Sequence, residues 1–386
     1  MNVLIIGGTG VLSSAVTSEA LRKGIKVTMI NRGNRKIAEG VELIKADKDD
    51  LKTIAKALDG RKFDAVMDYL CYTDAQTNKS ACFYSKYTKQ YFYISSCAVY
   101  DTASLNGRIA DEGSKKGLAI WTYSVDKWAS EQRIEALFKN SSVNYTIIRP
   151  SVTYGDTRIP YGISPAYGFH WTLCARILAG KPIIRWNEGV NRCNMTRVED
   201  FAVGVVGLIG NPKAYGEAFN VCGDESPTFN DVLSVLSEYL QKEVITVDLT
   251  SEFYAKELPN RAGEILGGRS IDAINSNTKL KEAVPEFKQT MFLREGVVKT
   301  LEAYKERGYQ HGIDWKFDAD TDRIVKKWCK KNGIDDQQYK LGFVDYLGTA
   351  TSGEKIKYWV GYHQDNPLVS ICIKMIRLFQ KVIRKN

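Results

Sequence analysis

Histidine is scarce in this sequence, and the cysteines are scattered along it. The chain has 3 histidines and 8 cysteines, with no Cys-x-x-Cys pair and no histidine at metal-ligand spacing from a cysteine. A structural zinc site needs such closely spaced ligands. Dispersed cysteines are typical of proteins whose thiols stay reduced. We therefore expect no metal and a cytoplasmic protein.

Long apolar runs are also missing. No segment approaches the roughly 18 apolar residues that a membrane-spanning helix requires. The short apolar run at residues 3–6 leads into a glycine turn, which argues against a secretory signal. The net charge of +9 suits anionic ligands such as nucleotides, but it does not by itself indicate nucleic-acid binding.

Residues 4–14, LIIGGTGVLSS, predict a strand, a tight turn and a helix. The start of a helix offers free backbone N–H groups and the positive end of its dipole, which bind a pyrophosphate, and glycines let the backbone approach it. Ser13 stands where a third glycine is usual. A lone glycine turn is weak evidence, so the rest of the chain has to support it. The residues that would contact a dinucleotide are Gly7, Gly8, Thr9, Gly10, Val11 and Leu12.

Strand-like and helix-like segments alternate through the first 150 residues. Strict alternation is typical of parallel strands joined by crossover helices on both faces, and so predicts an α/β fold with a doubly wound parallel sheet of six strands or more. We expect strands near residues 3–7, 26–31, 42–45, 64–69, 91–95 and 144–149, and helices near residues 11–23, 49–58, 74–87 and 122–138.

The pattern divides the chain into three sections. Residues 1–150 would form the dinucleotide-binding domain, with return segments around residues 180–215. Residues 151–308 would form a smaller α/β lobe, interleaved with the first domain, over the strand ends where open sheets bind ligands. Residues 309–386 are rich in Lys, Trp and Tyr and would form a helical extension.

A carboxylate is absent where the second strand ends. An NAD site normally has an acidic residue at the position of Asn31, which binds the ribose hydroxyls and repels a 2'-phosphate. Arg32 and Arg35 could instead hold that phosphate. The sequence therefore favours NADP(H) over NAD(H). The alternative is that the two cations are solvated and that Asn31 binds a NAD ribose.

Hydroxyl groups gather near the end of the fifth strand, where Ser96 follows Ser95, and Tyr123 and Lys127 lie four residues apart on a predicted helix. Residues at this spacing share a helix face. A phenol has a pKa of about 10, and a base near neutral pH needs it roughly 3 units lower. The ammonium and an oxidised nicotinamide supply charge of the right sign. Chance matches to this spacing are expected among 21 tyrosines, so the hypothesis depends on the order of the motifs.

These motifs together resemble the extended short-chain dehydrogenase/reductase superfamily and its NAD-dependent epimerase/dehydratase family. The resemblance covers about residues 1–308 and rests on GGTGVLS, ADKDD, FDAVMDYL, YISSCAVY, YSVDK, IIRPSVTYG and MTRVEDFAVGV. RPSVTYG and NRGNR resemble a bacterial branch of the family, and this resemblance does not indicate a substrate. The resemblance implies a Rossmann-type sheet.

The resemblance also implies roles for individual residues. Tyr123 would accept and donate the proton, Lys127 would lower its pKa and hold the nicotinamide ribose, and Ser96 would polarise the substrate hydroxyl. Further cofactor contacts would be made by Asp47 at the adenine, by Leu70 and Cys71 along the cofactor, and by Pro150 and Ser151 beside the nicotinamide amide.

The substrate motifs of the family are missing. Val152 replaces an asparagine that commonly contacts a sugar-nucleotide diphosphate, and Cys193 replaces a frequent diphosphate-binding arginine, although Arg192 is adjacent. His170 and Trp171 would line the substrate pocket or simply pack. Other cations that could bind an anion or remain at the surface are Arg158 and Arg185.

We expect a sugar-nucleotide epimerase, most simply a 4-epimerase, that acts as a homodimer. A reductase or dehydrogenase of a sugar or another carbonyl compound is the close alternative, and NADPH would favour it. Dehydration ranks low because Cys97 and Ala98 occupy the place of the usual acid and base carboxyls. Nucleic-acid binding on the same fold is a third alternative, disfavoured by the intact Ser, Tyr and Lys set.

The last segment predicts a basic amphipathic helix over residues 367–385, because Asn366-Pro367 is a helix-start signal. Such a helix either lies peripherally on the inner face of a membrane or packs on the protein's own lobe or a second copy. The apolar face has Leu368, Ile371, Cys372, Met375, Ile376, Phe379, Val382 and Ile383, and the polar face has Lys374, Arg377, Lys381, Arg384 and Lys385.

Overall fold

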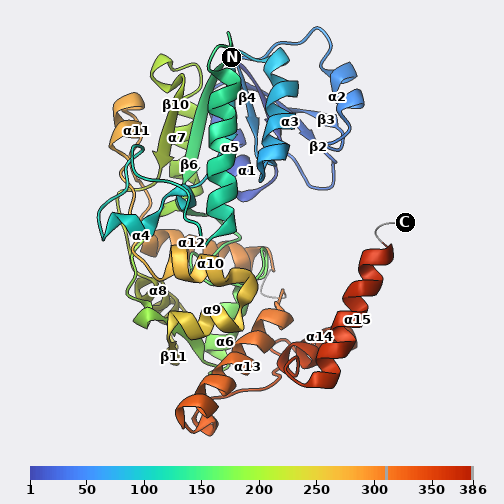
Figure 1. The fold of residues 1–386 in the computed structure, drawn as a ribbon, viewed down its shortest axis with the longest axis vertical. Helices are drawn as coiled ribbons and strands as arrows, with labels where there is room; N and C mark the ends of the chain where they lie inside the picture. The colour runs from blue at the N-terminus through green and yellow to red at the C-terminus, as the bar shows by residue number, and fades with distance from the viewer. Residues whose placement is uncertain (309–311, 384–386) are drawn as a thin grey trace.

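A seven-stranded sheet organises the first part of the molecule (Figure 1). The computed structural model describes residues 1–308 and 312–383, with side chains up to residue 375. The strand order is β10-β6-β5-β4-β1-β2-β3, and every neighbouring pair is parallel. The strands are β1 (Asn2–Ile6), β2 (Lys26–Asn31), β3 (Val41–Lys45), β4 (Ala65–Asp68), β5 (Gln90–Ile94), β6 (Asn144–Pro150) and β10 (Glu217–Val221).

Helices cover both faces of this sheet. Along β1, Val3 and Ile5 point into one core with α1 and α7, whereas Leu4 and Ile6 point into the opposite core with α2, α3 and α5. Because successive side chains of a strand point to opposite faces of the sheet, β1 contributes apolar side chains to two separate cores. The helices are α1 (Val11–Arg22), α2 (Leu51–Ala57), α3 (Asp74–Tyr84), α5 (Thr122–Phe138) and α7 (Val198–Gly207), and a short α4 (Thr102–Leu105) follows β5.

The predicted fold class is confirmed, and the expected strands and helices fall within a few residues of the observed ones. The structure adds a seventh strand, because the chain returns from the lobe through α7 and β10. Within the expected return region of residues 180–215, α7 and the following residues 208–214 pack on the sheet domain, whereas β8 (Ile183–Trp186) pairs with β11 (Thr246–Leu249) in the lobe.

The lobe lies below the sheet in the view of Figure 1, and aromatic side chains pack in its core. Trp186 packs against Tyr161, Phe229 and Tyr254 with ring centroids 5.4, 5.1 and 5.9 Å away. A second small sheet joins β7 (Val152–Tyr154) to β9 (Met195–Arg197). The helices of the lobe are α6 (Trp171–Leu178), α8 (Phe229–Leu240), α9 (Ser251–Glu257), α10 (Ala262–Glu264) and α12 (Leu293–Glu306), whereas α11 (Thr278–Ala283) packs against β10 of the large sheet.

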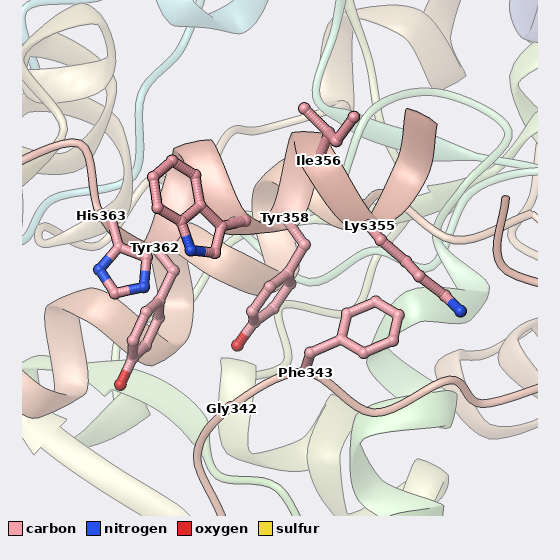
Figure 2. A pocket seen from close by; sticks show the side chains of 8 residues that line it. Gly342, Phe343, Lys355, Ile356, Tyr358, Tyr362 and His363 are labelled. Atoms are coloured by element: carbon pink, nitrogen blue, oxygen red, sulfur yellow. The ribbon is translucent and has the colours of Figure 1, made fainter. Parts of the chain in front are cut away.

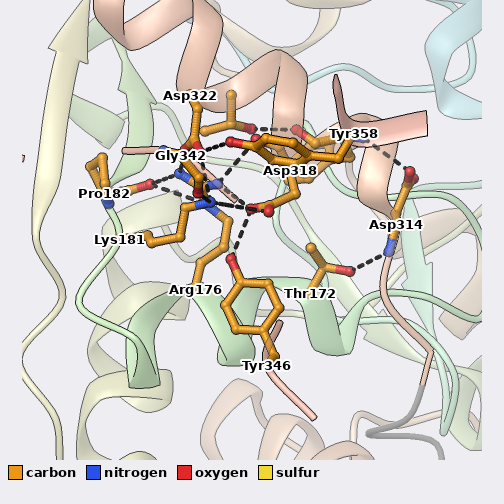
Figure 3. Close-up of polar contacts among 12 residues, drawn as sticks. Thr172, Arg176, Lys181, Pro182, Asp314, Asp318, Asp322, Gly342, Tyr346 and Tyr358 are labelled. Atoms are coloured by element: carbon orange, nitrogen blue, oxygen red, sulfur yellow. Dashed lines mark hydrogen bonds and ion pairs between the residues drawn. The ribbon is translucent and has the colours of Figure 1, made fainter. Parts of the chain in front are cut away.

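The C-terminal extension consists of α13 (Trp315–Asn332), α14 (Ser352–Tyr362) and α15 (Pro367–Ile383). A buried cluster of opposite charges joins α13 to the lobe (Figure 3). Arg176 and Lys181 of the lobe form ion pairs with Asp318 and Asp322 of α13, and all four side chains are fully buried. Within residues 1–308 and 312–383, no helix is long and apolar enough to cross a membrane. Of the predicted amphipathic helix, residues 384 and 385 lie outside the described residues.

Candidate active site

The glycine turn between β1 and α1 has the geometry that a bound pyrophosphate requires. Gly7 and Gly8 have φ values of +101° and +73°, which side chains rarely tolerate, and a Cβ on Gly8 would come within 2.3 Å of Met29. Gly10 caps α1, and its N–H donates to the Ser13 hydroxyl at 2.9 Å. Ser13, which stands where a third glycine is usual, is therefore buried beside the strand. Val11 and Leu12 are the first two residues of α1.

Side chains after β2 lie against the same turn. The amide of Asn31 donates to the Gly7 carbonyl at 3.3 Å and accepts the Gly33 N–H at 2.7 Å. The guanidinium of Arg35 donates to the Thr9 carbonyl at 3.1 Å. Asn31 and Arg35 thus lie where the adenosine end of a dinucleotide would pass. Arg32 is exposed on this loop, and Asp47 is exposed just after β3.

The turn after β4 forms another wall of the site. Leu70 packs directly over Gly7, where an added Cβ would lie 3.3 Å from its Cγ. The buried Asp68 carboxylate holds this turn, because it accepts the Leu70 N–H at 2.7 Å and the Cys71 thiol at 3.1 Å. Burial and the neighbouring carboxylate raise the pKa of the Cys71 thiol, so the thiol stays protonated.

Ser96, Tyr123 and Lys127 come together at the carboxyl edge of the sheet. Ser96 follows β5, and its hydroxyl is close enough to the Tyr123 phenol to lower the pKa of that phenol. The Lys127 ammonium lies 5.9 Å from the centroid of the Tyr123 ring. It donates to the carbonyls of Ile94 at 2.8 Å and Cys71 at 3.1 Å, and is only 3% exposed. The helix start and two strand ends therefore fix the three groups that the sequence predicted to converge.

Burial controls the protonation of the phenol and the ammonium. Although 38% of Tyr123 is exposed, desolvation at its hydroxyl raises the pKa of the phenol above its ordinary value, and the neighbouring Ser96 hydroxyl opposes this. Burial lowers the pKa of Lys127 to about 8, so the amine is mostly charged at neutral pH. The sequence led us to expect a lowered pKa for the phenol. In this structure the phenol stays protonated, because desolvation outweighs the nearby positive charge.

Residues at the end of β6 connect the sheet to the lobe. Pro150 ends the strand, and the Ser151 hydroxyl lies 3.1 Å from that of Thr196 near β9. Below them, Arg149 and Glu131 form a buried ion pair at 2.6 Å, and Ser95 donates to the same carboxylate. This pair fixes α5 against β6. Sequence reasoning missed it, because a buried charge pair has no periodic signature.

The residues predicted to contact substrate each have a local partner. His170 is 3% exposed, its Nδ1 accepts the Ile159 N–H at 3.2 Å, and burial lowers its pKa to about 3. Trp171 packs in the lobe core. Arg192 pairs with Asp272 at 3.0 Å, and Arg185 with Asp248 at 2.6 Å. Their contact with substrate stays a prediction.

Two other cations act on the phenol through their charge. The charges of Arg158 and Arg269 both act to lower the pKa of Tyr123. Arg158 donates to the Thr153 carbonyl at 2.9 Å, a neutral partner that leaves its charge uncompensated there. Arg269 pairs with Glu264 at 3.3 Å. The sequence offered no signal for Arg269, which follows α10 and lies far from the other site residues along the chain.

The fold and this arrangement define a member of the extended short-chain dehydrogenase/reductase superfamily. Within it, the chain belongs to the NAD dependent epimerase/dehydratase family, whose sequence model matches residues 3–222. The family predicted from the motifs is thereby confirmed.

Curated relatives of this chain have different functions. Chloroplast stem-loop binding protein of 41 kDa b from Arabidopsis thaliana is 27% identical over 243 residues, which are 59% of this chain and 60% of that protein. The match thus spans well under two thirds of the chloroplast protein. The 2'-dehydrokanamycin reductase of Streptomyces kanamyceticus is 20% identical over 262 residues, 67% of this chain and 72% of that protein.

Solved structures agree on the fold. UDP-glucuronic acid 4-epimerase from Bacillus cereus, in complex with NAD, has a TM-score of 0.61 and 17% identity, covering 80% of this chain and 99% of that one. Pal from Bacillus thuringiensis has a TM-score of 0.62 and 19% identity, covering 80% and 100%. At such identities the likeness concerns the fold alone.

Proposed function

We propose that the protein is an NAD(P)-dependent enzyme that transfers a hydride at a hydroxyl-bearing or keto carbon of a sugar nucleotide, most simply as a 4-epimerase. The observation that carries the proposal is the meeting of Ser96, Tyr123 and Lys127 beside a glycine turn with room only for backbone. A protein that merely bound a ligand would not need these three groups together.

Each of the three side chains has a role in this reaction. Tyr123 Oη takes the proton of the substrate hydroxyl during oxidation and returns a proton to the keto oxygen during reduction. Ser96 hydrogen-bonds the same substrate oxygen. The charged Lys127 stabilises the phenolate. A bound nicotinamide supplies the hydride acceptor and further positive charge. The protonated phenol of this structure is in the form that donates; to act as the base it must first release this proton, which the charges of Lys127 and of a bound nicotinamide would favour.

The residues around the glycine turn fit a dinucleotide, and they favour NADP(H). Arg35 already reaches the Thr9 carbonyl, and Arg32 is exposed beside it without a carboxylate at Asn31 to repel a 2'-phosphate. Arg158 and Arg269 contribute positive potential at Tyr123 and suit an anionic group such as a diphosphate. Because Val152 replaces the usual asparagine, these arginines would hold the diphosphate from positions of their own.

Two other functions have a specific observation behind them. A net NADPH-dependent reductase is favoured by Arg32 and Arg35 and by the similarity to 2'-dehydrokanamycin reductase. Nucleic-acid binding is favoured by the similarity to the chloroplast stem-loop binding protein. The intact Ser96, Tyr123 and Lys127 favour chemistry over binding alone.

One set of measurements separates the three functions. Mass spectrometry identifies any cofactor that leaves the purified protein on denaturation, and the protein is then mixed with sugar nucleotides and either NADP or NAD. An epimerase interconverts two sugars without net cofactor change, whereas a reductase consumes NADPH in step with product. A nucleic-acid binder shows no turnover and retains stem-loop RNA in a salt-sensitive way. Absence of both cofactor binding and turnover would contradict the proposal.

A further inference from the structure

The outer faces of α14 and α15 carry large apolar side chains that the described residues leave uncovered. Ile356 and Trp359 of α14 are 61% and 54% exposed, and Leu368, Ile371 and Met375 of α15 are 73%, 54% and 55% exposed. We call these five residues the apolar patch. Single exposed apolar residues are ordinary, but several on two consecutive helices indicate an interaction surface.

The spacing on α15 is that of one helix stripe. Leu368, Ile371 and Met375 follow one another at three and four residues, and the exposed Cys372 lies between them. In the sequence, the same spacing continues with Phe379 and Val382. The stripe is therefore longer than the part whose side chains are described.

An aromatic pocket adjoins the patch on α14 (Figure 2). It has a volume of about 480 Å³, and Ile356 and Trp359 belong to its lining together with Phe343 and Tyr358. The rings of Phe343 and Tyr358 lie 5.3 Å apart, edge to face. The exposed ring of Trp359 has the amphipathic character that is common where proteins meet the boundary between lipid headgroups and acyl chains.

Polar contacts fix the patch so that it faces outward. The Tyr358 hydroxyl donates to the buried Asp322 at 2.6 Å, which ties α14 to α13. Asp365, just before α15, pairs with Arg323 at 3.0 Å and Lys327 at 3.1 Å. From this anchored start, α15 stands apart from the lobe and, in the view of Figure 1, runs upward toward the level of the sheet domain. On α14, the side that carries Tyr358 is thus anchored, while Ile356 and Trp359 stay exposed.

The charge around the patch is positive. Residues 351–386 contain seven Lys or Arg and two Asp or Glu, and residues 366–386 contain no acidic residue. The two acids are engaged elsewhere, because Glu354 caps α14 and Asp365 pairs with α13. A second copy of this chain would bring like charges together. An anionic bilayer offers both an apolar layer and negative charge.

We propose that α14 and α15 bind the surface of an anionic lipid bilayer. The apolar patch enters the boundary between headgroups and acyl chains, and lysines such as Lys355, Lys357 and Lys374 contact the headgroups. The helix lies on the membrane and does not cross it. This inference is independent of the reaction that the site catalyses.

The test uses the full-length protein and lipid vesicles in co-sedimentation. We expect binding to vesicles that contain phosphatidylglycerol, at least about 10-fold weaker binding to pure phosphatidylcholine, and weakening by high salt. Ile371→Asn should weaken binding at least about 10-fold. Ser370→Asn introduces the same residue at the neighbouring position and should alter binding less than about 2-fold. Lys374→Gln should weaken it about 5-fold.

A second readout reports on α14. Brominated lipids should quench the fluorescence of the full-length protein more strongly than that of the Trp359→Phe variant. Equal binding to both vesicle types, equal binding of Ile371→Asn, or equal quenching of the two proteins would overturn the proposal. A change of oligomeric state by Ile371→Asn without vesicles, with no effect on vesicle binding, would assign the patch to a second copy and also overturn it.

Discussion

The Lys181 ammonium lies 2.6 Å from Oδ2 of Asp322, and both side chains are fully buried although 140 residues separate them along the chain. A buried ion pair contributes little net stability compared with an apolar pair, but removing one partner leaves a buried charge uncompensated. This relationship makes α13 part of the lobe's own core.

The first prediction concerns this cluster. Asp322→Ala should lower the free energy of unfolding by about 3–5 kcal/mol, because Lys181 and Arg176 then lose a buried counter-charge. Asp365→Ala is the matched control. Asp365 is 45% exposed, so its loss should cost less than about 1 kcal/mol. Urea unfolding measures both values, and equal costs would contradict the assignment of the cluster to the core.

The second prediction concerns the phenol. Tyr123→Phe should reduce kcat at least about 100-fold while the Kd of the dinucleotide changes less than about 3-fold, because only the proton-transferring oxygen is lost. Tyr72→Phe is the control, since the Tyr72 ring is also close to Lys127, at 5.6 Å. Steady-state kinetics and cofactor titration give both quantities. Retained turnover in Tyr123→Phe would remove this residue from its role.

The third prediction concerns the ammonium. Lys127→Met should lower kcat/KM at neutral pH at least about 100-fold and move the acidic limb of the pH profile upward, because the phenol loses the charge that stabilises its anion. Lys116→Met removes a half-buried lysine that does not contact Tyr123 in the described contacts, and it should leave the profile in place. A Lys127 variant with lower activity but an unmoved profile would indicate a purely structural role. Urea unfolding of both variants tests whether they are folded.

The fourth prediction concerns cofactor choice. Arg32→Ala should raise the Kd of NADPH at least about 10-fold and that of NADH less than about 2-fold, because only NADPH carries the 2'-phosphate. Lys36→Ala, nearby on the same loop, is the control. Asn31→Asp should also weaken NADPH binding relative to NADH binding, because the new carboxylate repels the 2'-phosphate. An equal loss of affinity for NADPH and NADH in Arg32→Ala would refute the contact between Arg32 and the 2'-phosphate.

The fifth prediction concerns pH-dependent stability. His170 has a pKa of about 3, well below its ordinary value of 6.5, so folding favours the neutral ring. The resulting stability is complete above about pH 6.5 and falls as the pH drops toward 3, because the unfolded chain then binds the additional proton. Between pH 7.5 and pH 5.5, protonation of this residue in the unfolded chain should lower the free energy of unfolding by about 1.4 kcal/mol. His170→Asn should flatten that decline in urea unfolding, whereas the exposed His363→Asn should not.

Much of the sheet could be predicted, because the sequence signals for its strands and helices lie within a few residues of one another. The strands β1, β2 and β5 are short apolar runs, and the glycine turn and helix spacing mark the beginning of α1 and the shared face of Tyr123 and Lys127. These signals depend on neighbours a few residues away.

Other features could not be predicted because their partners are distant in the sequence. Asp318 and Asp322 have the spacing of an ordinary solvated helix face, and only Arg176 and Lys181 make them part of the core. The raised pKa of Tyr123 likewise depends on side chains that pack around it from other segments. The pairing of β10 with β6 depends on a return of the chain that no local pattern announces.

That late pairing has a consequence for protein synthesis. β6 is complete at Pro150, but its neighbour β10 ends only at Val221. While the ribosome makes the intervening residues, the nascent chain carries an open edge of unpaired backbone groups, the kind of surface to which other strands attach. Protection of this edge by a chaperone, or delayed folding of the sheet, would then govern the yield of soluble protein in cells.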